Sequence, residues 1–261
     1  ILDTILNRLA VFLEKNDKLR RQIKGAMTYP VVVLFVAVIV TAVLLLKVVP
    51  SFDKMFADFG GTLPGPTQIV INMSYWLQAN GLFLFGGITA FFFAFKMLIK
   101  TEKGMYGWHA FLLKTPKVGD LISKVAVARF CRTLGTMVSS GVPILDGLDI
   151  CSRTAGNKVI ENAVLKAKES ISEGRNISEP LAESGVFPEM VCQMISVGEN
   201  TGALDIMLNK IADFYEDEVD QSVENLTAMI EPIIMVFLGG VVGGFIIAMY
   251  LPIFSMANQI Q

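Results

Sequence analysis

The sequence is poor in the residues that build metal and redox sites. Its 261 residues include one histidine, His109, and three cysteines, Cys131, Cys151 and Cys192, which lie far apart and form no CxxC pair. One imidazole cannot build a His-rich metal centre, and isolated cysteines are most often small buried hydrophobic residues. We therefore expect no metal ligands and no cofactor.

Signatures of catalysis and of nucleic-acid binding are also missing. The chain contains no GxxxxGK[ST], GxSxG or HExxH motif, so nucleotide hydrolysis would have to come from a partner. The net charge is −2 and the pI is about 5.6, which gives no basic field for nucleic acid. The sequence thus carries none of these signatures of catalysis.

Charged residues are scarce and apolar residues abundant. Charged residues make up 18% of the chain and hydrophobic residues 53%, with a mean hydropathy of +0.56. The excess is concentrated in three runs, 31–49, 82–99 and 233–251. At about 1.5 Å per residue, a run of this length covers roughly 28 Å, close to the thickness of a bilayer's hydrocarbon core. The three runs predict three transmembrane helices in an all-α polytopic membrane protein.

Basic residues orient the first two runs. Lys and Arg in short flanks resist translocation, so the flanks before the first run and after the second should be cytoplasmic. The segment between these runs should then be periplasmic. Parity places the carboxyl terminus outside as well. The residues concerned are Lys18, Arg20, Arg21 and Lys24, then Lys100 and Lys103, against Lys54, Asp53 and Asp58 in the intervening segment.

Residues 100–232 have the pattern of a helical bundle. We expect a helix over 118–140, a second opened by Pro143, a third capped by Asn157, and two short helices starting at Ser178 and over 188–195. In the segment before the second span, Thr67 is expected to cap a short helix.

An internal repeat relates the two ends of the chain. A shift of 202 positions aligns Leu2 to Glu14 with Leu204 to Glu216 without a gap, and the match continues to Pro30 on Pro232 and Pro50 on Pro252. This predicts a duplicated unit of cytoplasmic bundle and span. Because few residues precede Leu2, we expect that the first bundle is truncated.

The repeat sets the predicted organisation of the chain. It comprises 1–30 as the last helices of a truncated first cytoplasmic domain, 31–49 as the first span, 50–81 as a periplasmic loop, 82–99 as the second span, 100–232 as the second cytoplasmic bundle, 233–251 as the third span and 252–261 as a periplasmic tail.

Each repeat enters the membrane through a proline. Pro30 and Pro232 would press on the carbonyl groups of Ala26 and Ala228, four residues earlier. One interpretation is a fixed kink, and the other is a hinge that passes domain rotation to the span. Glu231, beside Pro232, either reaches interfacial water or contacts a basic group of a partner.

Several long motifs resemble the type II secretion system protein F family. They include GAMTYP at 25–30, PSFDKMFADFGGTLPGPT at 50–67, the segment 114–148 with ARFCRTLGTMVSSGVPILDGL, FPEMVCQMISVGENTGALDIML at 187–208, and IEPI with YLPIF near the end. The resemblance implies two homologous six-helix cytoplasmic domains with three spans, in a non-enzymatic inner-membrane platform protein. It also implies assembly and retraction ATPases, pilins or pseudopilins, and inner-membrane alignment proteins as partners in pilus assembly or, alternatively, type II secretion.

Candidate contact residues follow from these motifs. Arg129 and Arg132 match RFxRT and share a helix face, so they either pair with carboxylates of the bundle or contact the ATPase. The GExxG motif between two bundle helices either ends a helix or meets a partner. Four glycines at four-residue spacing in the third span favour close helix packing, in a homo-oligomer or against a pilin. These residues are Gly198, Glu199 and Gly202 in the motif, and Gly239, Gly240, Gly243 and Gly244 in the span.

Two other classes of membrane protein fit less well. A transporter or channel needs ionisable residues or broken helices inside its spans, whereas Lys47 and Lys96 both lie near span ends. A receptor needs a large outer domain, which the segment 50–81 does not supply. The acidic run from Glu216 to Asp220 is expected on a solvated helix face, with contact to a basic partner or a cation as the alternative.

Overall fold

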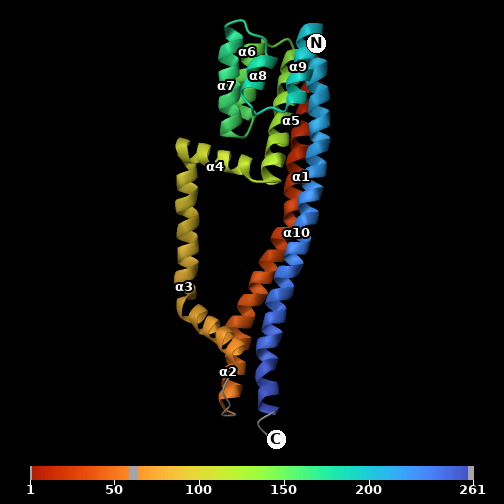
Figure 1. Cartoon of the computed structure of the whole chain (residues 1–261). Coiled ribbons are helices and arrows are strands. Elements are labelled where there is room, and N and C mark those ends of the chain that lie inside the picture. Colours follow the sequence, from red (N-terminus) through yellow and green to blue (C-terminus); the bar gives the residue numbers. More distant parts are fainter. Residues whose placement is uncertain (1, 59–63, 258–261) are drawn as a thin grey trace. The chain divides into compact units, whose positions relative to one another are not determined.

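The structure is a computed structural model that describes residues 2–58 and 64–257 (Figure 1). Every secondary-structure element in these two ranges is helical, which confirms the all-α prediction. The helices in chain order are α1 (Leu2–Val43), the π-helical segment η1 (Leu44–Val48), α2 (Val49–Asp58), α3 (Gly65–Lys100), α4 (Glu102–Lys114), α5 (Val118–Ser139), α6 (Ile144–Thr154), α7 (Lys158–Ser172), α8 (Ser178–Glu183), α9 (Glu189–Thr201) and α10 (Leu204–Ala257).

The chain divides into two compact units. One comprises residues 1–26 and 97–226, here called the bundle unit, and the other comprises 27–96 and 227–261, here called the apolar unit. The chain crosses from one unit to the other inside α1, α3 and α10. Each crossing in α1 and α10 falls a few residues before the proline that the repeat brings into register, Pro30 or Pro232.

The apolar unit contains the three predicted spans. Within the described residues, three helical stretches are long and apolar enough to cross a bilayer, and they contain the runs 31–49, 82–99 and 233–251. Their large apolar side chains face outward; Phe83 is 79% exposed and Val236 is 77% exposed. Such a surface is stable in lipid and costly in water.

Helices extend beyond the predicted spans into 50–81. The α2 helix and the first half of α3 lie there, and α3 runs without a break into the second apolar run. The prediction that Thr67 caps a short helix is wrong, because α3 begins at Gly65 and Gln68 N–H already bonds to Pro64 O (3.1 Å). Pro66 suits the first turn of a helix, where no intrahelical donor is needed, so the helix starts earlier than Thr67.

Two α3 hydroxyl groups bond to backbone carbonyls of other helices in the apolar unit. Thr67 Oγ1 donates to Ala248 O (2.5 Å), and Ser74 Oγ donates to Leu45 O (2.5 Å). Both side chains are buried. In a membrane interior such hydrogen bonds satisfy polar groups that have no access to water.

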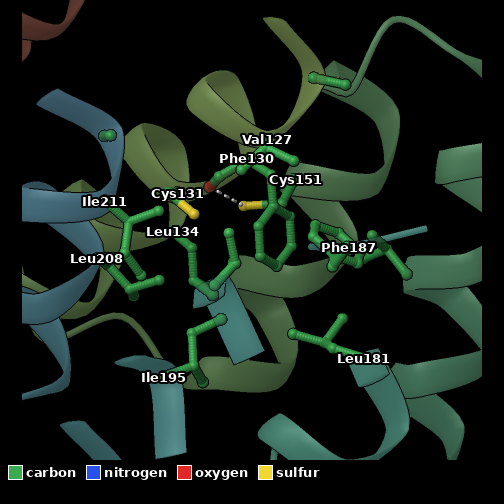
Figure 2. Close-up of a cluster of buried hydrophobic side chains, with 14 of the residues drawn as sticks. Val127, Phe130, Cys131, Leu134, Cys151, Leu181, Phe187, Ile195, Leu208 and Ile211 are labelled. Carbon is green, nitrogen blue, oxygen red and sulfur yellow. Dashed lines mark hydrogen bonds between the residues drawn. The ribbon is translucent and has the colours of Figure 1, made fainter. Parts of the chain in front are cut away.

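The bundle unit is built around one large hydrophobic core. Figure 2 shows Phe130 and Leu134 of α5 together with Ile195 of α9 and Leu208 and Ile211 of α10, and all five are fully buried. A smaller cluster of Leu19, Val219 and Val223 extends the contact among α1, α5 and α10. The core therefore joins the beginning of α10 to the helices before it.

The predicted bundle helices occur with small changes at their ends. The α5 helix ends before Gly141, which has φ +79°, and Asn157 caps α7 by accepting the Val159 N–H (2.9 Å). The exception is α9, which continues past 195 to Thr201 and ends at Gly202 in the left-handed conformation. Gly198 weakens helix propensity but does not end this helix, because tertiary packing holds it in place.

Candidate functional site

A buried arginine connects two long helices of the bundle unit. Arg132 of α5 donates from Nε to Glu216 Oε1 (2.8 Å), from Nη1 to Asn209 Oδ1 (3.1 Å) and from Nη2 to Asp213 Oδ1. The three acceptors follow one another at four- and three-residue spacing on one face of α10. Each of the three guanidinium nitrogens therefore donates to α10.

A lysine from α1 completes this cluster. Lys15 Nζ lies 2.9 Å from Glu216 Oε2 and 3.2 Å from Asp213 Oδ1. Two cations thus share two carboxylates, and the cluster formed by Lys15, Arg132, Asn209, Asp213 and Glu216, here called the Arg132 cluster, is neutral overall. A neutral, hydrogen-bonded set is the form in which buried charges are tolerated.

The pKa values in this cluster favour the charged forms. Hydrogen bonding to Glu216 raises the pKa of Lys15, although burial opposes the shift. Burial lowers the pKa of Arg132, but its hydrogen bonds to Glu216 and Asp213 outweigh burial and raise it. Burial likewise acts to raise the pKa of Asp213, and Arg132 and Lys15 together lower it below its usual value. The three groups therefore stay ionised around neutral pH.

The structure separates the two predicted arginines. Arg132 is 8% exposed and pairs within the chain, as one of the two interpretations expected. Arg129 is half-buried, and its Nη1 lies 3.1 Å from the position that a Cβ on Gly156 would take. Arg129 thus reaches the surface of the bundle beside the α6–α7 turn, whereas Arg132 does not.

The sequence predicted that the acidic run from Glu216 to Asp220 lies on a solvated helix face. The structure shows instead that part of this run is buried or paired. Glu216 is 8% exposed, Glu218 pairs with Lys124 of α5 (2.9 Å), and Asp220 accepts from Gln22 of α1 (2.9 Å). Asp217 is the one residue of this run whose side chain is exposed. From the sequence, Lys15, Asn209 and Asp213 were not identified as members of a cluster. The one related signal in the sequence is the alignment of 2–14 with 204–216, which relates the two helices that carry them, α1 and α10.

The GExxG motif forms the corner between α9 and α10. Gly198 lies inside α9, where a Cβ would come within 3.0 Å of Leu204 Cα, and Gly202 (φ +72°) ends the helix. Glu199 Oε1 accepts the Ile177 N–H (2.5 Å) and Oε2 accepts the Ser178 N–H (3.0 Å). Glu199 therefore caps the first turn of α8 from a neighbouring helix.

Both long helices continue through their prolines. Pro30 lies inside α1 and Pro232 inside α10, with Ala26 half-buried and Ala228 exposed four residues earlier. Glu231 is exposed. A Cβ built on any of four glycines of α10 would meet no described atom within 4 Å, so these positions are open to another helix; they are Gly239, Gly240, Gly243 and Gly244.

The cysteines lie in the bundle core. Cys131, Cys151 and Cys192 are buried and unbridged, and burial raises the pKa of the Cys151 thiol to about 12. Figure 2 shows the Cys151 thiol directed at Phe130 O, at 3.9 Å. Within residues 2–58 and 64–257 no group of His, Cys, Asp and Glu side chains could hold a metal ion.

One cavity of about 390 Å³ lies between α4, α7 and α8. Its lining contains Tyr106, Lys166 and Glu183 as ionisable residues, among small and apolar side chains. These groups lie on separate helices and form no nucleophile–base pair by hydrogen bonding in the described part of the chain. The cavity thus has the character of a packing hollow with a polar rim.

Comparison with known proteins places this geometry in a family. The family model for type II secretion system (T2SS) protein F matches residues 1–50 and 130–252. The chain is 59% identical, over its full length and 63% of the relative's, to the type IV pilus assembly protein PilC of Myxococcus xanthus. It is 46% identical to PilC of Pseudomonas aeruginosa over 99% of the chain and 70% of the relative.

Secretion proteins are also similar to the chain, at lower identity. The type II secretion system protein F of Pseudomonas aeruginosa is 35% identical over 99% of the chain and 64% of its own length. The chain thus spans somewhat under two thirds of the length of several of its relatives, including the one from Myxococcus xanthus.

Proposed function

Because this chain belongs to the type II secretion system protein F family, we propose that it is the inner-membrane platform of a type IV pilus assembly machine. In this role it is not an enzyme. It receives work from a cytoplasmic hexameric assembly ATPase and passes that work to pilin subunits as they leave the membrane for the growing fibre. A retraction ATPase and inner-membrane alignment proteins are the further partners.

One observation carries the choice of pilus assembly over secretion. Two relatives named for pilus assembly are 59% and 46% identical to the chain, whereas the secretion protein of Pseudomonas aeruginosa is 35% identical. A type II secretion platform is the alternative that the experiment below distinguishes.

The helices that connect the two units support a mechanical role. The α1, α3 and α10 helices each contain a unit boundary, so the connections carry regular backbone hydrogen bonds instead of loops. A helix transmits displacement and rotation along its axis better than a loop does. In this proposal Ala26 with Pro30, and Ala228 with Pro232, are the hinges at which rotation of the bundle enters the spans, and Glu231 meets a basic group of a partner there.

The Arg132 cluster supports the same role. It fixes α1 and α10 to α5 through Lys15, Arg132 and the buried carboxylate of Glu216, so a push on the bundle moves both long helices together. Arg129, Glu199 and Gly202 then lie on or near the bundle surface that a partner would contact, with the buried Gly198 at the corner behind them. The glycine stripe of α10 packs against a second copy or a pilin helix.

A duplicated origin is part of the proposal. The two segments that match the family model end at 50 and 252, which differ by the same 202 positions as the sequence repeat. We propose that 1–50 and the end of the chain are corresponding parts of two repeats, with the bundle in the cytoplasm and the segment 50–81 and the carboxyl terminus in the periplasm.

Deletion and complementation test the function. A strain that lacks the gene should lose surface pili, as counted by electron microscopy and by sheared pilin, and should keep type II secretion of a reporter. Loss of secretion with normal pili would assign the chain to the alternative. Alkaline phosphatase fusions after 81 and after 161 test orientation; activity of the second fusion would contradict the cytoplasmic bundle.

A further inference from the structure

The α4 helix directly follows the second apolar run and has a surface of its own. It begins two residues after α3 ends, and Thr101 Oγ1 accepts the Gly104 N–H (3.2 Å) while donating to Leu98 O (2.7 Å). These bonds end one helix and start the next without a flexible linker. The helix therefore starts at the point where the chain leaves the apolar run.

Close backbone contacts fix both ends of α4. A Cβ on Gly104 would lie 2.1 Å from Leu98 O, and a Cβ on Gly119 would lie 2.1 Å from Leu113 O. Lys117, between α4 and α5, adopts a left-handed φ of 67°. Figure 1 shows that α4, before this corner, runs crosswise to α5, which follows it. Only glycine permits such tight corners, so the direction of α4 is built into the chain.

One side of α4 packs on the bundle. His109 Nδ1 accepts the Lys158 N–H at the start of α7 (2.8 Å), and Gly119 at the following corner is buried. On the opposite side Phe111 is 62% exposed, and its ring stacks on Trp108 at 5.9 Å between ring centroids. Gly107, one turn before Phe111, is also exposed. The bundle therefore covers one face of α4 and leaves an aromatic face open.

The open face is strongly basic. Lys103 and Lys114 are exposed and lie on the same side of α4, eleven residues or about three turns apart. Lys100 and Lys117 add two exposed lysines at its ends, and no ion pair involves these four within the described residues. Glu102 is the one acidic residue of the helix. Phe111 is exposed and Trp108 is half-buried, and aromatic rings beside lysines are typical of helices that lie in the membrane interface.

We propose that α4 lies on the bilayer surface and that its lysines bind the headgroups of anionic phospholipids. The inference rests on the proposed membrane role, because it takes the adjoining run 82–99 as a span. Trp108 and Phe111 would enter the boundary between headgroups and acyl chains, and Lys103 and Lys114 would meet lipid phosphates. Lipid binding then holds the bundle unit at a fixed height on the membrane while leaving it free to rotate in the membrane plane.

Fluorescence quenching in lipid vesicles tests this surface. The chain has two tryptophans, so Trp76→Phe leaves Trp108 as the single reporter. The full chain is reconstituted in mixtures of phosphatidylcholine and phosphatidylglycerol with bromine on the acyl chains of one lipid or the other. At equal mole fractions, brominated phosphatidylglycerol should quench Trp108 about twofold more than brominated phosphatidylcholine, because lysines enrich anionic lipid locally.

Matched variants separate charge from position. Lys103→Gln with Lys114→Gln should abolish the preference for phosphatidylglycerol, whereas Lys18→Gln with Lys210→Gln, two exposed lysines elsewhere in the bundle unit, should leave it unchanged. Equal quenching by both lipids in the unmodified chain would overturn the proposal. So would quenching by aqueous acrylamide with none by either lipid.

A second reporter distinguishes failure of this inference from failure of its premise. Phe92→Trp, with both natural tryptophans replaced by phenylalanine, places the reporter in the middle of the second apolar run. Quenching of this reporter by brominated lipid with none of Trp108 would reject the α4 proposal alone. Absence of quenching at both positions would reject the span itself and with it the membrane role.

Discussion

Thr67 and Ser74, two turns apart on α3, each donate a hydroxyl hydrogen bond to a carbonyl that a proline leaves without its helical donor. Ala248 O, the acceptor of Thr67, would normally receive the N–H of residue 252, which is Pro252. Leu45 O, the acceptor of Ser74, lies in the π-helical segment, where the Val49 N–H bonds to Leu44 O. The next donor along the chain would be the N–H of residue 50, but residue 50 is proline and has none. Pro50 and Pro252 are the pair that the 202-residue repeat aligns, so α3 supplies a hydroxyl donor to a carbonyl near each of these two prolines.

Removal of either hydroxyl should destabilise the apolar unit. Ser74→Ala and Thr67→Val each leave one buried carbonyl without a donor, at a cost of about 1–3 kcal/mol. Thermal unfolding of the full chain in detergent micelles measures the effect, with Ser51→Ala as the control, because its exposed hydroxyl bonds only to Lys47 O of its own helix. Unchanged stability of both variants would mean that water or detergent satisfies these carbonyls.

The sequence predicts the helices well, but it does not predict the side-chain hydrogen bonds between separate helices. Apolar runs, Asn157 and the glycines that end helices are local signals, and the structure confirms the bundle helices that they mark. The hydrogen bonds of Ser74 and Thr67 depend on where separate helices lie, which no local pattern reports. Thr67 fits the composition of a helix cap, but its actual acceptor lies 181 residues away.

The Arg132 cluster shows the same limit. The charge pattern placed Glu216 among solvated acids, whereas its carboxylate lies between Arg132 and Lys15 from two other helices. Spacing correctly put Arg129 and Arg132 on one side of α5, but it could not tell which of them the bundle would bury.

Loss of the Arg132 charge should destabilise the bundle unit strongly. Arg132→Met leaves Glu216 buried with Lys15 as its remaining cation, so we expect a loss of about 3 kcal/mol, the lower end for a broken buried pair. Replacement of both partners, Arg132→Met with Glu216→Leu, should recover part of the loss. Urea unfolding followed by circular dichroism measures both, with Asp217→Asn at an exposed position as the control. A loss no greater than that of Asp217→Asn would show that the ion pair does not stabilise the fold.

Stability should fall at acid pH through Asp213. Its pKa is lowered in the folded protein from the ordinary 3.8, so its contribution is complete above that value and disappears as the pH falls through the folded pKa. Lys15 has the opposite sign: its pKa is raised above 10.5, so its contribution is lost only as the pH rises beyond that value. The melting temperature of Asp213→Asn should therefore depend less on pH below about 4 than that of the unmodified chain. Parallel acid profiles for the two proteins would contradict this assignment.

The two interpretations of Glu199 make different predictions for its substitution. As the cap of α8 it accepts the Ile177 and Ser178 N–H groups, so Glu199→Ala should lower stability by about 1–2 kcal/mol, while Glu199→Gln, which keeps one acceptor, should cost less. As a contact to the ATPase it would leave stability unchanged and abolish pili. Unfolding and pilus counts on the same variants separate the two, with Glu189→Gln, an exposed carboxylate at the start of the same helix, as the control. Normal stability of Glu199→Ala together with lost pili would replace the cap by a partner contact, because only a group outside the chain could then account for the phenotype.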